Sequence, residues 1–100
     1  MWWMETIRVQ SATGKEQITL RELTFLGSEI RENPDCQGLR EATVLSHASI
    51  PGCFALLLFW DTDGPQHGGS PLGMNLAQSL KSFGLVDHSV WIENNEKKRS

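Results

Sequence analysis

Hydrophobic and polar residues alternate along four segments of the chain, and this period of two residues predicts β-strands. In the first segment Ile7 and Val9 lie on one side, while Arg8 and Gln10 lie on the other. The second and third segments are separated by turn residues at 50–52, so we expect them to form an antiparallel hairpin. The predicted strands are Met4–Ala12, Leu39–Ala48, Cys53–Trp60 and Val86–Glu93.

Two further segments repeat their apolar residues near the 3.6-residue period of an α-helix. The first spans Glu16–Glu32, and Pro34 ends it because the residue before a proline is driven out of the helical region. The second begins at Ser70-Pro71, where the serine can cap the first turn and proline suits the first helical position. Gly84 stands where a left-handed C-terminal cap belongs. The apolar faces are Leu20, Leu23, Leu26, Gly27 and Ile30 in the first helix, and Leu72, Leu76, Ala77, Leu80 and Phe83 in the second.

The elements therefore follow the order β-α-β-β-α-β, which is the split βαβ arrangement of ferredoxin-like α+β domains. Such a domain has a four-stranded antiparallel sheet with two helices on one face. A chain of 100 residues fits a single domain. We expect an ordered core over about 4–93 and a polar tail over 94–100.

The third strand, CFALLLFW, is apolar on both of its faces. Two helices can cover only one face of a four-stranded sheet, so the other face needs a second cover. The simplest cover is another copy of the chain. The sequence therefore predicts an obligate homodimer through the sheet face, with the two sheets packed face to face.

Composition excludes several other classes of protein. The formal net charge is -3, so no basic field exists to attract nucleic acid or an anionic membrane. The longest apolar run is too short to span a bilayer, and the first ten residues do not form a secretory signal. Cys36 and Cys53 are too few for a disulfide framework or a zinc site, which favours a reducing cytoplasm.

The segment FWDTDGPQHGGSPLG, residues 59–73, joins the third strand to the second helix. It lacks the later ligands of a calcium loop and the lysine of a phosphate loop. Three glycines give it backbone freedom on both sides of His67. Two interpretations stay open: a lid over a pocket, formed by residues 61–70, or a plain connection.

The histidines His47, His67 and His88 lack the short spacing of metal ligands, so we expect no metal site. His88 shares a strand face with Val86 and Val90, which would turn it toward a pocket between sheet and helices. There it would act as a general base or be an ordinary core histidine. Trp60 would be either a core residue or the wall on which an aromatic substrate stacks.

The element order, Trp60 at the end of the third strand, the Ser70-Pro71 helix start and SVWIE in the last strand resemble the antibiotic biosynthesis monooxygenase family. The resemblance implies a dimeric α/β barrel with a small-molecule pocket between sheet and helices in each subunit. It also implies oxygenase chemistry without metal or flavin. Haem-degrading relatives have an asparagine in the first strand and a histidine on the second helix, and this chain has neither. We therefore do not expect haem degradation.

The leading hypothesis is a cofactor-independent monooxygenase-like enzyme that acts on an aromatic or polycyclic small molecule. The alternative is a dimeric binding or structural domain without catalysis, which the absence of tyrosine favours. For the enzyme, we expect His88 and His67 as catalytic residues and Trp60, Ser70 and Leu76 as substrate-binding residues. We expect no metal and no cofactor.

Overall fold

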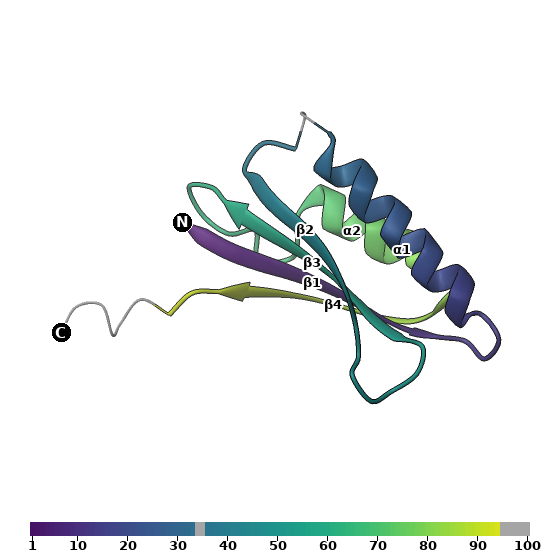
Figure 1. The fold of residues 1–100 in the computed structure, drawn as a ribbon. Coiled ribbons are helices and arrows are strands. Elements are labelled where there is room, and N and C mark those ends of the chain that lie inside the picture. The colour runs from purple at the N-terminus through teal and green to yellow at the C-terminus, as the bar shows by residue number, and fades with distance from the viewer. Residues whose placement is uncertain (34–35, 95–100) are drawn as a thin grey trace.

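A computed structural model describes residues 1–33 and 36–94 of the chain. The order of elements is the predicted β-α-β-β-α-β (Figure 1). Of the predicted tail, only Asn94 falls within the described residues. The elements are β1 (Trp2–Ser11), α1 (Glu16–Arg31), β2 (Leu39–Ser46), β3 (Cys53–Asp61), α2 (Pro71–Leu80) and β4 (Gly84–Ile92).

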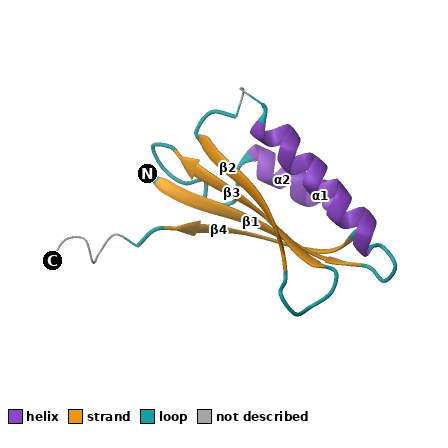
Figure 2. Cartoon of the chain, viewed as in Figure 1, coloured by secondary structure: helices purple, strands orange, loops and turns teal. Residues whose placement is uncertain are grey.

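The four strands form one antiparallel sheet in the order β2-β3-β1-β4, and both helices lie on the same face of it (Figures 1 and 2). This confirms the ferredoxin-like fold. The sheet is open, with β2 and β4 at its edges. No helix among the described residues has the length and apolar character needed to cross a membrane.

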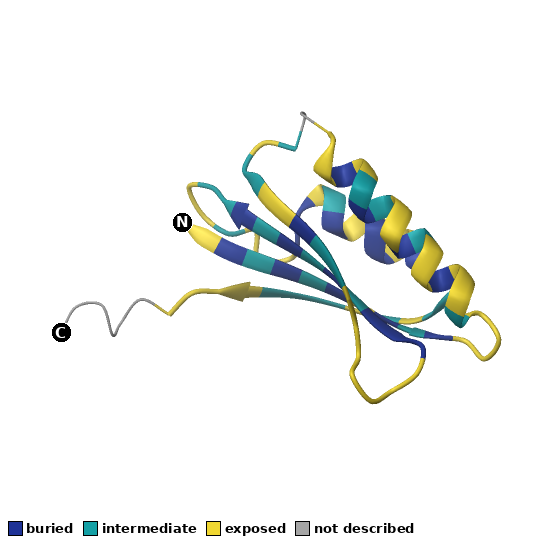
Figure 3. Ribbon diagram, in the orientation of Figure 1, coloured by how far each residue is buried: buried dark blue, intermediate teal, exposed yellow. Residues whose placement is uncertain are grey.

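The core lies between the helices and the sheet, and buried positions alternate along the central strands (Figure 3). Every second residue of β1 and β3 faces this layer, as the alternating pattern predicted. The buried face of α1 differs from the prediction in one place, since Leu20 is exposed and Thr19 is buried instead. The fully buried large residues include Ile7, Val9, Leu23, Leu56, Leu58 and Leu80.

Most element ends differ from the sequence prediction by one or two residues, and two of these differences have a clear structural reason. The first strand begins at Trp2 rather than Met4, because Trp2 and Trp3 pair with the end of β3. Gly84 is not a left-handed cap, because it belongs to β4 and has no positive φ. A side chain at Gly84 would collide with the backbone carbonyl of Gln10, so glycine permits close pairing with β1.

Candidate functional site

The carboxylate of Glu5 is the centre of a buried polar cluster in the layer between sheet and helices. Glu5 lies on β1, on the same side as Ile7 and Val9, and its exposed fraction is 0%. Oε1 accepts hydrogen bonds from the indole nitrogen of Trp60 at 3.0 Å and from the hydroxyl of Ser70 at 2.7 Å. Oε2 contacts the backbone nitrogen of Ser70 at 2.8 Å and Nε2 of His88 at 2.7 Å. A buried charged group needs such partners, because burial without them is costly.

Ser70 brings the start of α2 to this carboxylate. It is the N-cap of the helix, and its hydroxyl accepts a hydrogen bond from the amide of Gly73 at 2.9 Å while donating to Glu5. Gly73 must be a glycine here, since a β-carbon would overlap the Glu5 carboxylate. The predicted cap of α2 is therefore confirmed, and it is tied directly to β1.

His88 occupies the position opposite Ile7 on the edge strand β4. Its side chain faces the helix layer, as predicted, and is 17% exposed. The backbone of Gly69, which has a φ of 101°, lies against the imidazole ring. The pair of His88 and Glu5 thus combines a fully buried carboxylate with a histidine that solvent can still reach.

Trp60 and Leu76, predicted to bind substrate, are both buried. The ring of Trp60 stacks on Trp3, with 5.4 Å between ring centroids and an interplanar angle of 13°. Leu76 belongs to the hydrophobic core on the buried face of α2. Three of the five predicted site residues, Trp60, Ser70 and His88, therefore meet at Glu5, and Leu76 packs in the adjoining core.

His67, the second predicted base, lies apart from this cluster. It is exposed in the segment 61–70. The ends of that segment are held in place: the hydroxyl of Thr62 accepts a hydrogen bond from the Trp3 indole at 2.8 Å, and Ser70 binds Glu5. Gly64 and Gly68 have open space around them. The segment therefore has fixed ends and an exposed middle.

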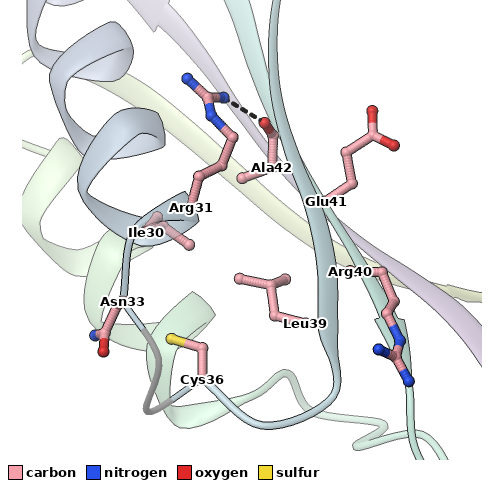
Figure 4. A pocket seen from close by; sticks show the side chains of 8 residues that line it. All are labelled: Ile30, Arg31, Asn33, Cys36, Leu39, Arg40, Glu41 and Ala42. Carbon is pink, nitrogen blue, oxygen red and sulfur yellow. Dashed lines mark hydrogen bonds between the residues drawn. The ribbon is translucent and has the colours of Figure 1, made fainter.

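A cavity of about 210 Å³ opens between the end of α1 and β2, the edge strand farthest from His88. The side chains of Ile30, Leu39 and Cys36 point toward one another in it, while Arg40 and Glu41 point away (Figure 4). Arg31 at its rim donates a hydrogen bond to the carbonyl of Ala42 at 2.6 Å. Its volume is below the range of about 300–1,000 Å³ that is usual for ligand pockets.

The indole of Trp60 lies between this cavity and His88. Leu39 of the cavity pairs with Trp60 across β2 and β3, and Trp60 in turn binds Glu5 on β1. The cavity lies beside β2 and His88 lies on β4, which are the two edge strands of the sheet. Because β3 and β1 separate these strands, the cavity and His88 are near opposite edges of the sheet. The predicted base and this cavity are not brought together.

The three histidines lie in separate surroundings: His47 in a turn, His67 in an exposed segment and His88 beside Glu5. Within 1–33 and 36–94, no three residues of the His, Cys, Asp and Glu types are grouped as a metal site requires. His47 instead closes a turn, because its Nδ1 accepts hydrogen bonds from the amides of Ser49 and Ile50, both at 3.0 Å. Cys36 is half-buried, Cys53 is buried, and both thiols are free.

Glu5 is the site residue that the sequence reasoning did not identify. One signal for it exists in the sequence. Glu5, Ile7 and Val9 occupy every second position of the strand, so a charged residue lies on its apolar face. A carboxylate there must be buried with partners or break the strand pattern. The identity of those partners is visible only in the folded chain.

Comparison with known proteins shows a shared fold. No protein-family profile matches the sequence, and no curated protein matches it. Among solved structures, a conserved protein from Methanosarcina mazei superimposes with a TM-score of 0.70 at 15% identity, over 94% of each chain. A protein from Deinococcus radiodurans, provisionally named an antibiotic biosynthesis monooxygenase, has a TM-score of 0.69 at 16% identity over 92% of each chain. A cofactor-independent oxygenase from Streptomyces nogalater has a TM-score of 0.58 at 11% identity over 93% of each chain.

The chain therefore has the fold of structures named antibiotic biosynthesis monooxygenases, which confirms the resemblance at the level of fold. At these identities the comparison shows the fold alone.

Proposed function

We propose that this protein is a cofactor-independent, monooxygenase-like enzyme that oxidises an aromatic or polycyclic small molecule, with His88 as the general base. The observation that carries the proposal is the 2.7 Å contact between His88 and the buried carboxylate of Glu5. A carboxylate beside an imidazole stabilises the imidazolium that forms when the histidine takes a proton. The oxygenase named among the structures of the same fold supports the choice of reaction.

The reaction suits a substrate with an activated CH₂ group beside aromatic rings. His88 takes a proton from that carbon, and the carbanion passes its electrons to dioxygen as a carbon–oxygen bond forms. The peroxide anion is protonated by His88. The O–O bond then breaks as the second hydrogen leaves the carbon, which gives a ketone and one molecule of water. Dioxygen is the oxidant, and the substrate carbon supplies all four electrons.

Solvent reaches only 17% of the His88 side chain, so a substrate of several rings would need the segment 61–70 to move before it could meet this base. Gly69 lies against the imidazole, so opening at this glycine would expose the base. We assign this segment the role of a lid, with exposed His67 as a second polar group that meets the substrate. Trp60 and Leu76 would then form the apolar floor beneath the substrate.

The open face of the sheet supports a homodimer. This face carries large apolar side chains that the helices do not cover, and Trp91 and Leu85 are 58% and 79% exposed. Arg8 and Asp87 lie on the same face, 3.9 Å apart. An apolar surface of this kind is typical of an interface rather than of a free monomer.

A second candidate, a dimeric binding or structural domain without catalysis, has an observation of its own. All four hydrogen-bond contacts of the Glu5 carboxyl oxygens are with groups of the protein itself, and Trp60 is stacked on Trp3 rather than on an open wall. Such a cluster can simply hold the elements together.

Oxygen consumption distinguishes the two candidates. The purified protein is mixed with a hydroxylated anthrone, a tricyclic carbon acid, and dissolved oxygen and product are followed. If the protein is the proposed oxygenase, one dioxygen should be consumed per quinone formed. His88→Ala should lose this rate of oxygen consumption, and His47→Ala should keep it. Equal rates of oxygen consumption in all three proteins and in buffer would contradict the proposed oxygenase activity for this substrate class. Binding of the compound without turnover would favour the second candidate.

A further inference from the structure

We infer that Glu5 is a positioning residue that holds neutral His88 in the tautomer with its proton on Nε2, so that Nδ1 is the atom that accepts a proton. The catalytic part of this inference rests on the proposed function. The tautomer itself rests only on the hydrogen bonds around Glu5.

The donors around Glu5 determine the direction of each hydrogen bond. The indole of Trp60 and the backbone amide of Ser70 can only donate. The hydroxyl of Ser70 accepts from the amide of Gly73 at 2.9 Å, so its own proton is directed to Oε1 of Glu5. Three of the four contacts to the carboxyl group are therefore made by donors.

The fourth contact belongs to His88. A carboxylate has about four acceptor positions, two on each oxygen, and three are filled by these donors. Nε2 of His88 lies 2.7 Å from Oε2 and takes the remaining position. Because a carboxylate only accepts, Nε2 must carry the hydrogen. Nδ1 of the neutral ring then has a free lone pair, and no hydrogen bond to it is made within the described part of the chain.

Packing holds the two side chains in this orientation. The backbone of Gly69 lies against the imidazole ring, and the backbone of Gly73 lies against the carboxylate. Glycines at both positions allow this close approach, since a β-carbon at either would collide with the pair. The ring therefore has little room to turn and exchange its two nitrogens.

Nitrogen-15 NMR of the whole protein, labelled at histidine, tests the tautomer directly. We expect the His88 signals of a pyrrole-like, protonated Nε2 and a pyridine-like, bare Nδ1. His47 provides an internal control, because its Nδ1 accepts two backbone amides and it must show the same pattern. In Glu5→Gln the His88 pattern should change while that of His47 stays the same, since the new amide group can donate to His88.

Each outcome decides the inference. A protonated Nδ1 on His88 in the wild-type protein would overturn it, whether or not the protein has oxygenase activity. The expected tautomer without oxygenase activity would leave Glu5 as a positioning residue and contradict the proposed function instead. If activity is found, Glu5→Gln should lower kcat at least tenfold with little change in KM, and Glu5→Asp should recover part of the loss. The wild-type spectrum is decisive even if Glu5→Gln does not fold.

Discussion

Ser70 holds the Glu5 carboxylate at two points: its backbone nitrogen lies 2.8 Å from Oε2 and its hydroxyl 2.7 Å from Oε1. One residue thereby links the end of the 61–70 segment and the start of α2 to the first strand. The same carboxylate binds Trp60 on β3 and His88 on β4. A single buried side chain thus connects three strands and a helix, and this connection gives testable consequences for stability and for activity.

Replacing Ser70 by alanine should destabilise the protein more than the loss of an ordinary helix cap. The cap alone is worth about 1 kcal/mol. The substitution also removes a hydrogen bond to a buried carboxylate, which costs about 1–3 kcal/mol more. We expect the free energy of unfolding to fall by about 2–4 kcal/mol in urea denaturation. Ser79→Ala, on the exposed side of the same helix, should change it by less than about 0.5 kcal/mol. Equal effects of the two variants would contradict the role of Ser70.

Gly73→Ala should destabilise the protein although helix propensity favours alanine by about 1 kcal/mol. The added methyl group would collide with the Glu5 carboxylate, and overpacking of this kind typically costs about 1–3 kcal/mol. Thermal unfolding should show a lower melting temperature. Gly68→Ala is the control, because nothing lies near a β-carbon at that position. A stabilised Gly73→Ala protein would mean that Glu5 is not packed against this helix.

The segment 61–70 should exchange its amide hydrogens fastest in its middle. Residues 63, 64 and 66–68 are exposed, whereas Thr62 and Ser70 are held by hydrogen bonds to Met1 and Glu5. We expect rapid exchange at Gly64 and Gly68 and slow exchange at Ser70. Uniformly slow exchange would contradict a lid.

His67→Ala separates stability from function in that segment. Because the side chain is exposed, its loss should change the free energy of unfolding by less than about 0.5 kcal/mol. If the segment closes over a substrate, the same variant should alter KM or kcat in the anthrone assay. Unchanged kinetics in an active enzyme would leave His67 without a catalytic role.

A charge in the open sheet face should prevent dimer formation. Leu57 lies on that face of β3, between the two neighbouring strands of the sheet. We expect sedimentation at micromolar protein to give a dimer for the wild type and a monomer for Leu57→Glu, because an unpaired charge in an apolar interface is costly. Phe25→Glu, on the outer side of α1, is the matched control and should remain a dimer. A stable wild-type monomer would remove the dimer proposal.

The sequence by itself determined the order of elements, the faces of the central strands and the start of α2. These features depend on local rules: alternation sets the faces of a strand, and Ser70 followed by Pro71 marks a helix start wherever it occurs. The face of β4 that carries His88 was likewise predictable from alternation with Val86 and Val90.

Only the tertiary structure decided what these residues do together. Trp60, Ser70 and His88 are separated from Glu5 by 55, 65 and 83 positions, so no local pattern could show that they share one carboxylate. The end of α2 was mispredicted for a related reason, because Gly84 is required by close pairing with β1 rather than by a helix cap. Long-range contacts determine both the partners of Glu5 and the need for glycine at position 84. These contacts depend on how the elements pack, and not on neighbouring residues in the chain.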